Sequence, residues 1–187
     1  ARIVLCCYLP FDRRIGEENI GGEEPAASWT NAYTVTNKMF LSMNARLCDL
    51  IEKMGFHAAV PENIGRISKE KIYSNWSQRH LAYAAGLGTF GVNNMLITKK
   101  GCCGRYASVV TDLPVLPDSP MEQELCLYKR NGSCGLCVSQ CPVGALSGEH
   151  VFVREKCAER TGIFKKRFGE SVCGKCVVGK PCTFRAP

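Results

Sequence analysis

Cysteines in the C-terminal third of the chain constrain its fold more than any other feature of the sequence. The segment RNGSCGLCVSQCP, residues 130–142, carries the rhythm C-x2-C-x3-C-P, and CGKCVVGKPC, residues 173–182, repeats a CxxC pair followed by a delayed cysteine. Regular hydrophobic periodicity is weak across this region. We therefore expect the region to fold around bound metal rather than around an apolar core. Eight cysteines follow residue 120: Cys126, Cys134, Cys137, Cys141, Cys157, Cys173, Cys176 and Cys182.

The spacing is typical of iron–sulfur clusters that are held by thiolates. The bacterial ferredoxin run is C-x2-C-x2-C-x3-C-P, and its last cysteine ligates the other of two clusters. The leading cysteine of that run belongs at position 131, where this chain has Asn131. We expect Cys126, eight residues before Cys134, to supply the missing thiolate through a loop.

The crossing rule divides the eight cysteines into two sets of four, the number that each 4Fe–4S cluster needs. The first set is Cys126, Cys134, Cys137 and Cys182. The second set is Cys141, Cys157, Cys173 and Cys176. Two zinc sites of four thiolates each would use the same residues, and one cluster with four idle cysteines is a further alternative.

The charge of the chain is compatible with bound clusters. Lys and Arg number 24 against 17 Asp and Glu, a formal net charge of +7. Two oxidised clusters with deprotonated ligands would add about −4 and leave about +3. A basic surface that balances the clusters is therefore favoured over a nucleic-acid-binding face, and we expect no nucleic-acid partner.

Cysteine usage and hydropathy also bound the cellular setting. Thirteen cysteines, an odd number that includes CxxC pairs, favour metal binding in the cytoplasm over a set of disulfides. No apolar run approaches the roughly 20 residues of a membrane helix, so no membrane association is expected. The chain starts at once with an apolar strand, ARIVLCCYL, and we expect it to begin inside a longer protein.

The part before the cysteine groups has the pattern of mixed helices and strands. Ser28 and Ser77 are expected helix N-caps, and residues 10–25 are expected to be a loop. The segment PVLPDSP, residues 114–120, is the expected linker between residues 1–113 and 121–187. We expect helices at 28–54 and 78–85 and strands at 1–9, 56–60, 94–98 and 105–113, the last two forming a hairpin.

A glycine-rich segment completes a resemblance to a known family. AAGLGTFGVNNMLIT, followed by VVTDLPV and the two cysteine groups, resembles the epoxyqueuosine reductases and the related cobalamin-dependent reductive dehalogenases. Its glycines, Gly86, Gly88 and Gly91, lie between a helix and a strand, the reverse of the dinucleotide-binding order, so an NAD site is rejected. A tight helix-to-strand connection is the alternative explanation of these glycines.

The resemblance implies a fold and a set of roles. The fold would be α+β, with a nitroreductase-like α/β cobalamin domain followed by a small two-cluster ferredoxin-like module. The glycine segment, with Asn93 and Asn94, would contact a base-off cobalamin. The family's tRNA reductases have an acidic proton donor that KIYSNWSQRH lacks, so Tyr73 and His80 are the candidate donors, with packing residues as the alternative.

The implied function is that of an iron–sulfur oxidoreductase. It would take electrons from a flavodoxin or ferredoxin, pass them through two 4Fe–4S clusters to the cobalamin, and reduce a small electrophile or a modified nucleoside. The alternative is an electron-transfer protein that has neither cobalamin nor a catalytic centre of its own.

Overall fold

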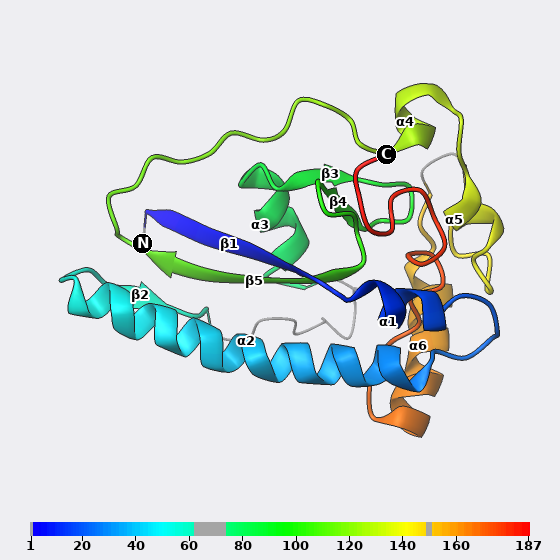
Figure 1. Ribbon diagram of the computed structural model, residues 1–187, viewed down its shortest axis with the longest axis horizontal. Coiled ribbons are helices and arrows are strands. Elements are labelled where there is room, and N and C mark those ends of the chain that lie inside the picture. Colours follow the sequence, from blue (N-terminus) through cyan, green and yellow to red (C-terminus); the bar gives the residue numbers. More distant parts are fainter. Residues whose placement is uncertain (1, 62–73, 149–150) are drawn as a thin grey trace.

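The computed structural model describes residues 2–61, 74–148 and 151–187, and its helices and strands are mixed along the chain (Figure 1). This mixture agrees with the expected α+β class. The strands are β1 (Ile3–Pro10), β2 (Ala58–Ala59), β3 (Gly88–Phe90), β4 (Leu96–Thr98) and β5 (Gly104–Thr111). The helices are α1 (Arg13–Glu18), α2 (Ala27–Lys53), α3 (Gln78–Ala84), α4 (Leu127–Asn131), α5 (Leu136–Ser139) and α6 (Arg154–Phe168).

The largest sheet has the strand order β1-β5-β2, and both pairings are antiparallel. The ladder between β1 and β5 runs from the pair Ile3–Thr111 to the pair Pro10–Gly104. Helix α2 lies along this sheet, and α3 also packs against β1 and β5 (Figure 1). No described helix is both long enough and apolar enough to cross a bilayer.

The expected hairpin between residues 94–98 and 105–113 is wrong. Strand β4 pairs with β3, and β5 pairs with β1 and β2. After β4, Thr98 and Gly101 exchange backbone hydrogen bonds of 3.0 and 2.9 Å, which close a tight turn. Strand β5 pairs with β1 over eight residues, whereas β4 is only three residues long and would provide fewer pairing positions.

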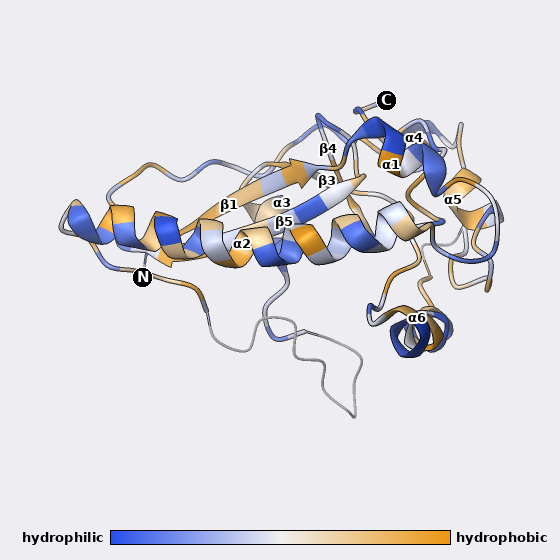
Figure 2. Ribbon diagram, turned by 60° about the horizontal axis from the view of Figure 1, so that its bottom comes forward, coloured by the Kyte–Doolittle hydropathy of each residue, from blue (hydrophilic) through white to orange (hydrophobic). Residues whose placement is uncertain are grey.

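Helix α2 is confirmed, although it starts at Ala27 after the N-cap Ala26, so the expected cap at Ser28 is wrong. Apolar and polar residues alternate along the helix (Figure 2). Its buried positions are Trp29, Thr36, Phe40, Asn44 and Ile51. The expected loop at 10–25 contains α1, whose N-cap Asp12 accepts a hydrogen bond from the backbone of Arg14 at 2.9 Å.

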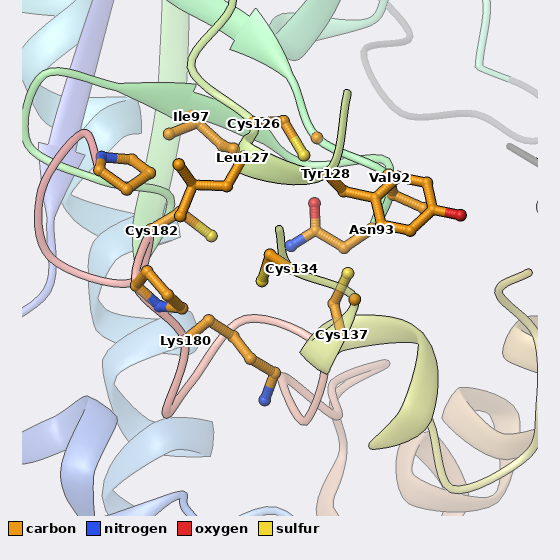
Figure 3. Close-up of a pocket in the computed structure, with 14 residues that line it drawn as sticks. Val92, Asn93, Ile97, Cys126, Leu127, Tyr128, Cys134, Cys137, Lys180 and Cys182 are labelled. Carbon is orange, nitrogen blue, oxygen red and sulfur yellow. The ribbon is translucent and has the colours of Figure 1, made fainter. Parts of the chain in front are cut away.

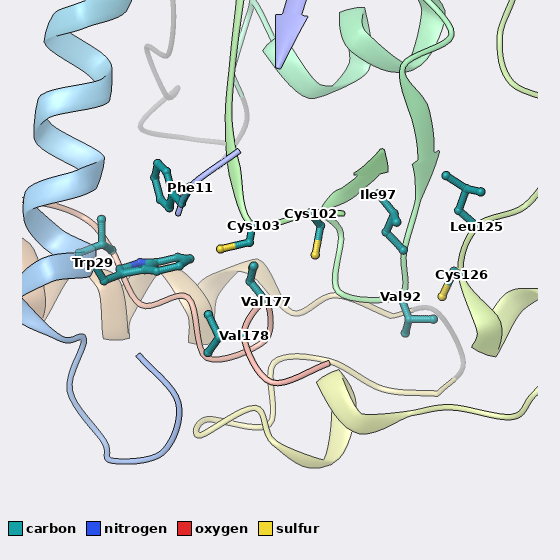
Figure 4. Close-up of a cluster of buried hydrophobic side chains, with 11 residues drawn as sticks. Phe11, Trp29, Val92, Ile97, Cys102, Cys103, Leu125, Cys126, Val177 and Val178 are labelled. Carbon is teal, nitrogen blue, oxygen red and sulfur yellow. The ribbon is translucent and has the colours of Figure 1, made fainter. Parts of the chain in front are cut away.

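Residues from both sides of segment 114–120 share one apolar core (Figure 4). Phe11 packs edge-on against Trp29 with ring centroids 5.3 Å apart. Residues 114–120 are exposed and form no helix or strand. The buried members of this core are Phe11, Trp29, Val92, Ile97, Cys102, Cys103, Leu125, Cys126, Val172, Val177 and Val178.

Backbone hydrogen bonds also join the two parts of the chain. Cys102 and Cys103, in the turn before β5, are fully buried. The Cys102 amide donates to the carbonyl of Cys182 at 2.9 Å, and the Cys103 amide donates to the carbonyl of Thr183 at 3.0 Å. The end of the cysteine-rich segment is therefore fixed against the turn that leads into the sheet.

Candidate metal centre

The four cysteines of the first predicted set line one cavity. Figure 3 shows Cys126, Cys134, Cys137 and Cys182 around a common space. Burial, and after it the charges of the other three thiols of the set, raises the pKa of the Cys137 thiol to about 11. Four thiols from separate parts of the chain are therefore close enough to act on one another.

Contacts with β3 determine how Cys126 reaches this cavity. The hydroxyl of Thr89 accepts a hydrogen bond from the amide of Leu125 at 2.9 Å and donates to the carboxylate of Glu124 at 2.8 Å. The same carboxylate accepts a hydrogen bond from the amide of Cys126 at 2.8 Å. Asn131 occupies the position of the missing cysteine. Its side-chain oxygen instead accepts hydrogen bonds from the amide and the hydroxyl of Ser133.

The second predicted set lines another cavity, of about 200 Å³. Cys141 follows α5, Cys157 lies in α6, and Cys173 and Cys176 lie in the loop after α6. Burial, and after it the charges of the other thiols of its set, raises the pKa of the Cys176 thiol to about 12. Cys137 of the first set has the same effect on Cys176, so the two sets are neighbours.

Each cavity offers four sulfur donors, which is the chemistry of a cubane cluster with one thiolate per iron. Within the described ranges, no three His, Cys, Asp or Glu side chains converge closely enough to hold a single metal ion. Four thiols at each cavity match the number of ligands that a 4Fe–4S cluster takes, and both the clusters and the assignment of the eight ligands stay predictions.

The predicted cobalamin-contacting glycines pack against the chain itself. A Cβ atom on Gly86, where φ is +73°, would overlap the carbonyl oxygen of Ser119, and one on Gly88 would overlap that of Ile97. A Cβ on Gly91 would lie 2.7 Å from the Asn93 side chain. These positions therefore need glycine for close backbone packing, as the tight-connection explanation expects, and their contact with a cobalamin stays a prediction.

The two asparagines after these glycines also make contacts within the chain. Asn93 is 4% exposed, and its amide nitrogen donates to the carbonyl of Cys176 at 3.0 Å. The oxygen of the same side chain accepts a hydrogen bond from the amide of Met95 at 3.1 Å. Asn94 has a positive φ of 56°, and its carbonyl accepts a hydrogen bond from Arg79. Asn93 therefore connects the glycine segment to a predicted cluster ligand.

Of the two candidate proton donors, Tyr73 lies outside the described residues. His80 is exposed, and its Nδ1 is 2.6 Å from the hydroxyl of Ser77. Its ring lies against Phe90 with centroids 4.8 Å apart. Partial burial and the nearby charges of Arg79 and Arg154 lower the pKa of His80. His80 lines neither of the two cysteine cavities.

Two buried lysines lie beside the predicted ligands and are not among the residues expected from the sequence. Lys175 is 6% exposed and Lys180 is 8% exposed. Lys175 donates to the carbonyls of Asn19 at 3.0 Å and Gly21 at 2.6 Å, in the loop before α2. Both lysines lie between the last three cysteines in the sequence. This position could have indicated them, because a lysine in a cluster-binding loop is close to the negative charge of the cluster.

A ninth cysteine also approaches the first set. The sulfur of Cys102 lies 3.9 Å from that of Cys182. Its thiol donates to the Cys182 sulfur, which lowers the pKa of Cys182, whereas the same contact and burial raise the pKa of Cys102. The turn before β5 brings Cys102 to Cys182, which is 80 residues away in the sequence. The local spacing of the cysteines therefore could not predict this contact.

No protein-family model matches the chain, but individual proteins do. A tetrachloroethene reductive dehalogenase of Desulfitobacterium hafniense is 32% identical over 149 residues, 74% of this chain and 24% of that protein. An epoxyqueuosine reductase of Cyclobacterium marinum is 33% identical over 81 residues, 43% of this chain and 24% of that protein. The chain is a homologue of the epoxyqueuosine reductases and the reductive dehalogenases. The resemblance that its motifs indicated is thus confirmed.

Solved structures show that this homologue shares their fold. The structure of the catabolic reductive dehalogenase NpRdhA matches 98% of this chain and 26% of its own length, with a TM-score of 0.65 and 20% identity. An epoxyqueuosine reductase from Streptococcus thermophilus matches 83% of this chain and 40% of its own length, with a TM-score of 0.53 and 21% identity. The chain spans about a quarter of the length of the two curated relatives.

One structural neighbour corrects an expectation about partners. It is an epoxyqueuosine reductase in complex with an epoxyqueuosine-modified tRNA stem loop, with a TM-score of 0.51 and 22% identity over 82% of this chain. The expectation that a nucleic-acid partner is absent is therefore not supported. Its reasoning considered only the balance of charge against clusters, which does not distinguish whether a basic surface also meets RNA.

Proposed function

We propose that this reductase homologue is an electron-carrying unit that holds two 4Fe–4S clusters. The observation that carries the proposal is that each predicted set of four thiols lines a cavity of its own. The members of each set come from segments far apart in the sequence, so local spacing alone does not bring them together. When bound, the clusters would supply one-electron transfer.

The residues of the chain would bind and orient these clusters and limit their contact with water. The eight thiolates would be the ligands. Asn93 would hold the loop that carries Cys176, and the contacts of Thr89 and Glu124 would hold Cys126 at the first cavity. Hydrogen bonds and burial around a cluster are the means by which a protein tunes its potential.

The division of the chain at residues 114–120 is part of the same proposal. Residues 121–187 would be the two-cluster module, and residues 1–113 the domain against which it packs. The buried contacts of Cys102 and Cys103 with Cys182 and Thr183 support a fixed mutual position, which electron transfer between a module and its domain requires.

Metal analysis tests the proposed function. Protein prepared without oxygen should contain about eight irons and eight acid-labile sulfides per chain and should be brown. Zinc at two ions per chain, without sulfide, would refute the cluster proposal and support the zinc alternative.

A variant pair tests the displaced ligand. Cys126→Ser should lose part of the iron, with the loss confined to the first cluster and the second cluster retained. Cys48→Ser, on α2 away from both sets, is the matched control and should keep the full content. Equal iron in both variants would show that Cys126 is not a ligand.

A second candidate function is reduction through cobalamin. A reductive dehalogenase whose structure is described as suggesting a mechanism for B12-dependent dehalogenation matches 92% of this chain, with a TM-score of 0.60 and 20% identity. The glycine segment packs closely against the chain itself, and its contact with cobalamin stays a prediction, so we derive no step through this cofactor. Equilibrium dialysis of the reconstituted protein against hydroxocobalamin tests binding, and absence of binding favours the electron-transfer alternative.

The substrate of the complete protein would be a small electrophile or a modified nucleoside, and the electron donor a flavodoxin or ferredoxin. One structural neighbour was solved with a tRNA stem loop, so RNA binding is the measurement that we propose for distinguishing a modified nucleoside in RNA from a small electrophile as the substrate. A basic protein that contacts several phosphates loses affinity steeply as salt increases. Binding of a tRNA anticodon stem loop should therefore weaken with a steep salt slope, and a flat slope would oppose this assignment.

A further inference from the structure

A buried lysine lies at the boundary between the two predicted cluster sites. Lys180 is 8% exposed and lines the first cavity together with the four thiols of the first set (Figure 3). Its ammonium reaches toward the second set, because it donates to the carbonyl of Lys175 at 3.1 Å. The Lys175 carbonyl and the amide nitrogen of Cys176 belong to the same peptide bond.

Three acceptors surround this ammonium. Besides the Lys175 carbonyl, it donates to the carbonyl of Val178 at 2.5 Å and to the side-chain oxygen of Gln140. A protonated lysine has three N–H donors and no acceptor. The three oxygens therefore match a charged ammonium, whereas a neutral amine would leave one of them without a donor.

The ammonium of Lys180 lies close in sequence or in space to Cys141 and Cys182, the two cysteines that are predicted to cross to the other cluster. Gln140 directly precedes Cys141, the residue that the crossing rule assigns to the second cluster. Lys180 itself is two residues before Cys182, which crosses to the first cluster. A cation enclosed between two sets of thiolates interacts with them more strongly than a surface cation, because water screens it less.

We propose that the ammonium of Lys180 is a shared counter-charge for the two clusters and makes them easier to reduce. This inference rests on the proposed function. Adding one electron to a cluster with four thiolates takes its charge from about −2 to about −3, and a nearby fixed positive charge stabilises the more negative state. The residue acts by position and charge and is not a ligand.

The test compares two variants of Lys180 with a surface control. Lys180→Met removes the charge and keeps an unbranched stem, Lys180→Arg keeps the charge, and Lys166→Met removes a charge from the exposed side of α6. Each protein is prepared without oxygen, its iron and sulfide are counted, and its clusters are titrated with dithionite while electron paramagnetic resonance is recorded.

We expect Lys180→Met to keep its iron and to disfavour reduction of at least one cluster by about tenfold, a shift of about 59 mV to lower potential for a one-electron couple. Lys180→Arg and Lys166→Met should titrate close to the unsubstituted protein. Loss of iron in Lys180→Met, with full iron in Lys180→Arg, would also support the counter-charge, because the charge would then be needed to hold the clusters.

Other results would overturn the inference. Full iron with unchanged potentials in Lys180→Met would show that the lysine only ties loops together. Equal loss of iron in the Met and Arg variants would assign its role to packing rather than to charge. Unsubstituted protein without iron and sulfide would instead refute the proposed function, and the inference with it, so the two failures are distinguishable.

Discussion

Replacing Asn93 with alanine should destabilise the protein because this side chain joins the glycine segment to the cluster-binding loop. Asn93 is 4% exposed and makes two hydrogen bonds, one to the carbonyl of Cys176 and one from the amide of Met95. A buried polar group that loses its partner costs roughly 1–3 kcal/mol. Two such losses would cost about 2–6 kcal/mol, and because both hydrogen bonds are only partly buried, we expect Asn93→Ala to lower the free energy of unfolding by the smaller part of this range, about 2–4 kcal/mol.

Urea unfolding of protein prepared without oxygen, followed by tryptophan fluorescence, measures this loss in the cluster-loaded form around which the loop of Cys176 is expected to fold. Asn31→Ala, at an exposed position of α2, is the control and should change stability by less than about 0.5 kcal/mol. A loss below about 0.5 kcal/mol for Asn93→Ala, with an unchanged m-value, would refute the reasoning, because the contact with Cys176 would then carry no net stability.

Three further predictions concern packing, charge and pH. Gly88→Ala should lower stability by about 1–3 kcal/mol because its Cβ would overlap the carbonyl of Ile97, whereas Gly162→Ala, which has open space in α6, should be neutral or stabilising in the same thermal melt. Lys175→Met should cost about 2–4 kcal/mol in urea unfolding, since two charge-assisted hydrogen bonds to the loop before α2 are lost; an unchanged midpoint would contradict this. Hydrogen bonds from His57 lower the pKa of Asp112, so the carboxylate stabilises the fold above about pH 4 and this contribution disappears as the pH falls through its lowered value. Melting temperatures of the unsubstituted protein and Asp112→Asn should therefore converge below pH 4, and a constant difference would exclude this ion pair as the cause.

Local spacing allowed the sequence to predict several elements and the grouping of the cysteines. Strand β1, helix α2 and helix α3 follow from short runs of hydrophobic periodicity, and the structure confirms them. The structure also gives each predicted set of four cysteines its own cavity, although the ligand assignment itself stays a prediction. Ligand spacing is visible in the sequence because the geometry of a cluster restricts how far apart neighbouring thiolates can be.

Only the tertiary structure decided which distant segments meet. The sequence could not show that β5 pairs with β1 rather than with β4, because pairing depends on how the whole chain closes its loops. Nor could it show that Asn93 contacts Cys176, 83 residues away, or that three oxygens surround the ammonium of Lys180. The sequence also could not show that Gly86 and Gly88 lie against the carbonyls of Ser119 and Ile97, because a glycine pattern indicates only that space is needed and the fold determines which atoms occupy that space.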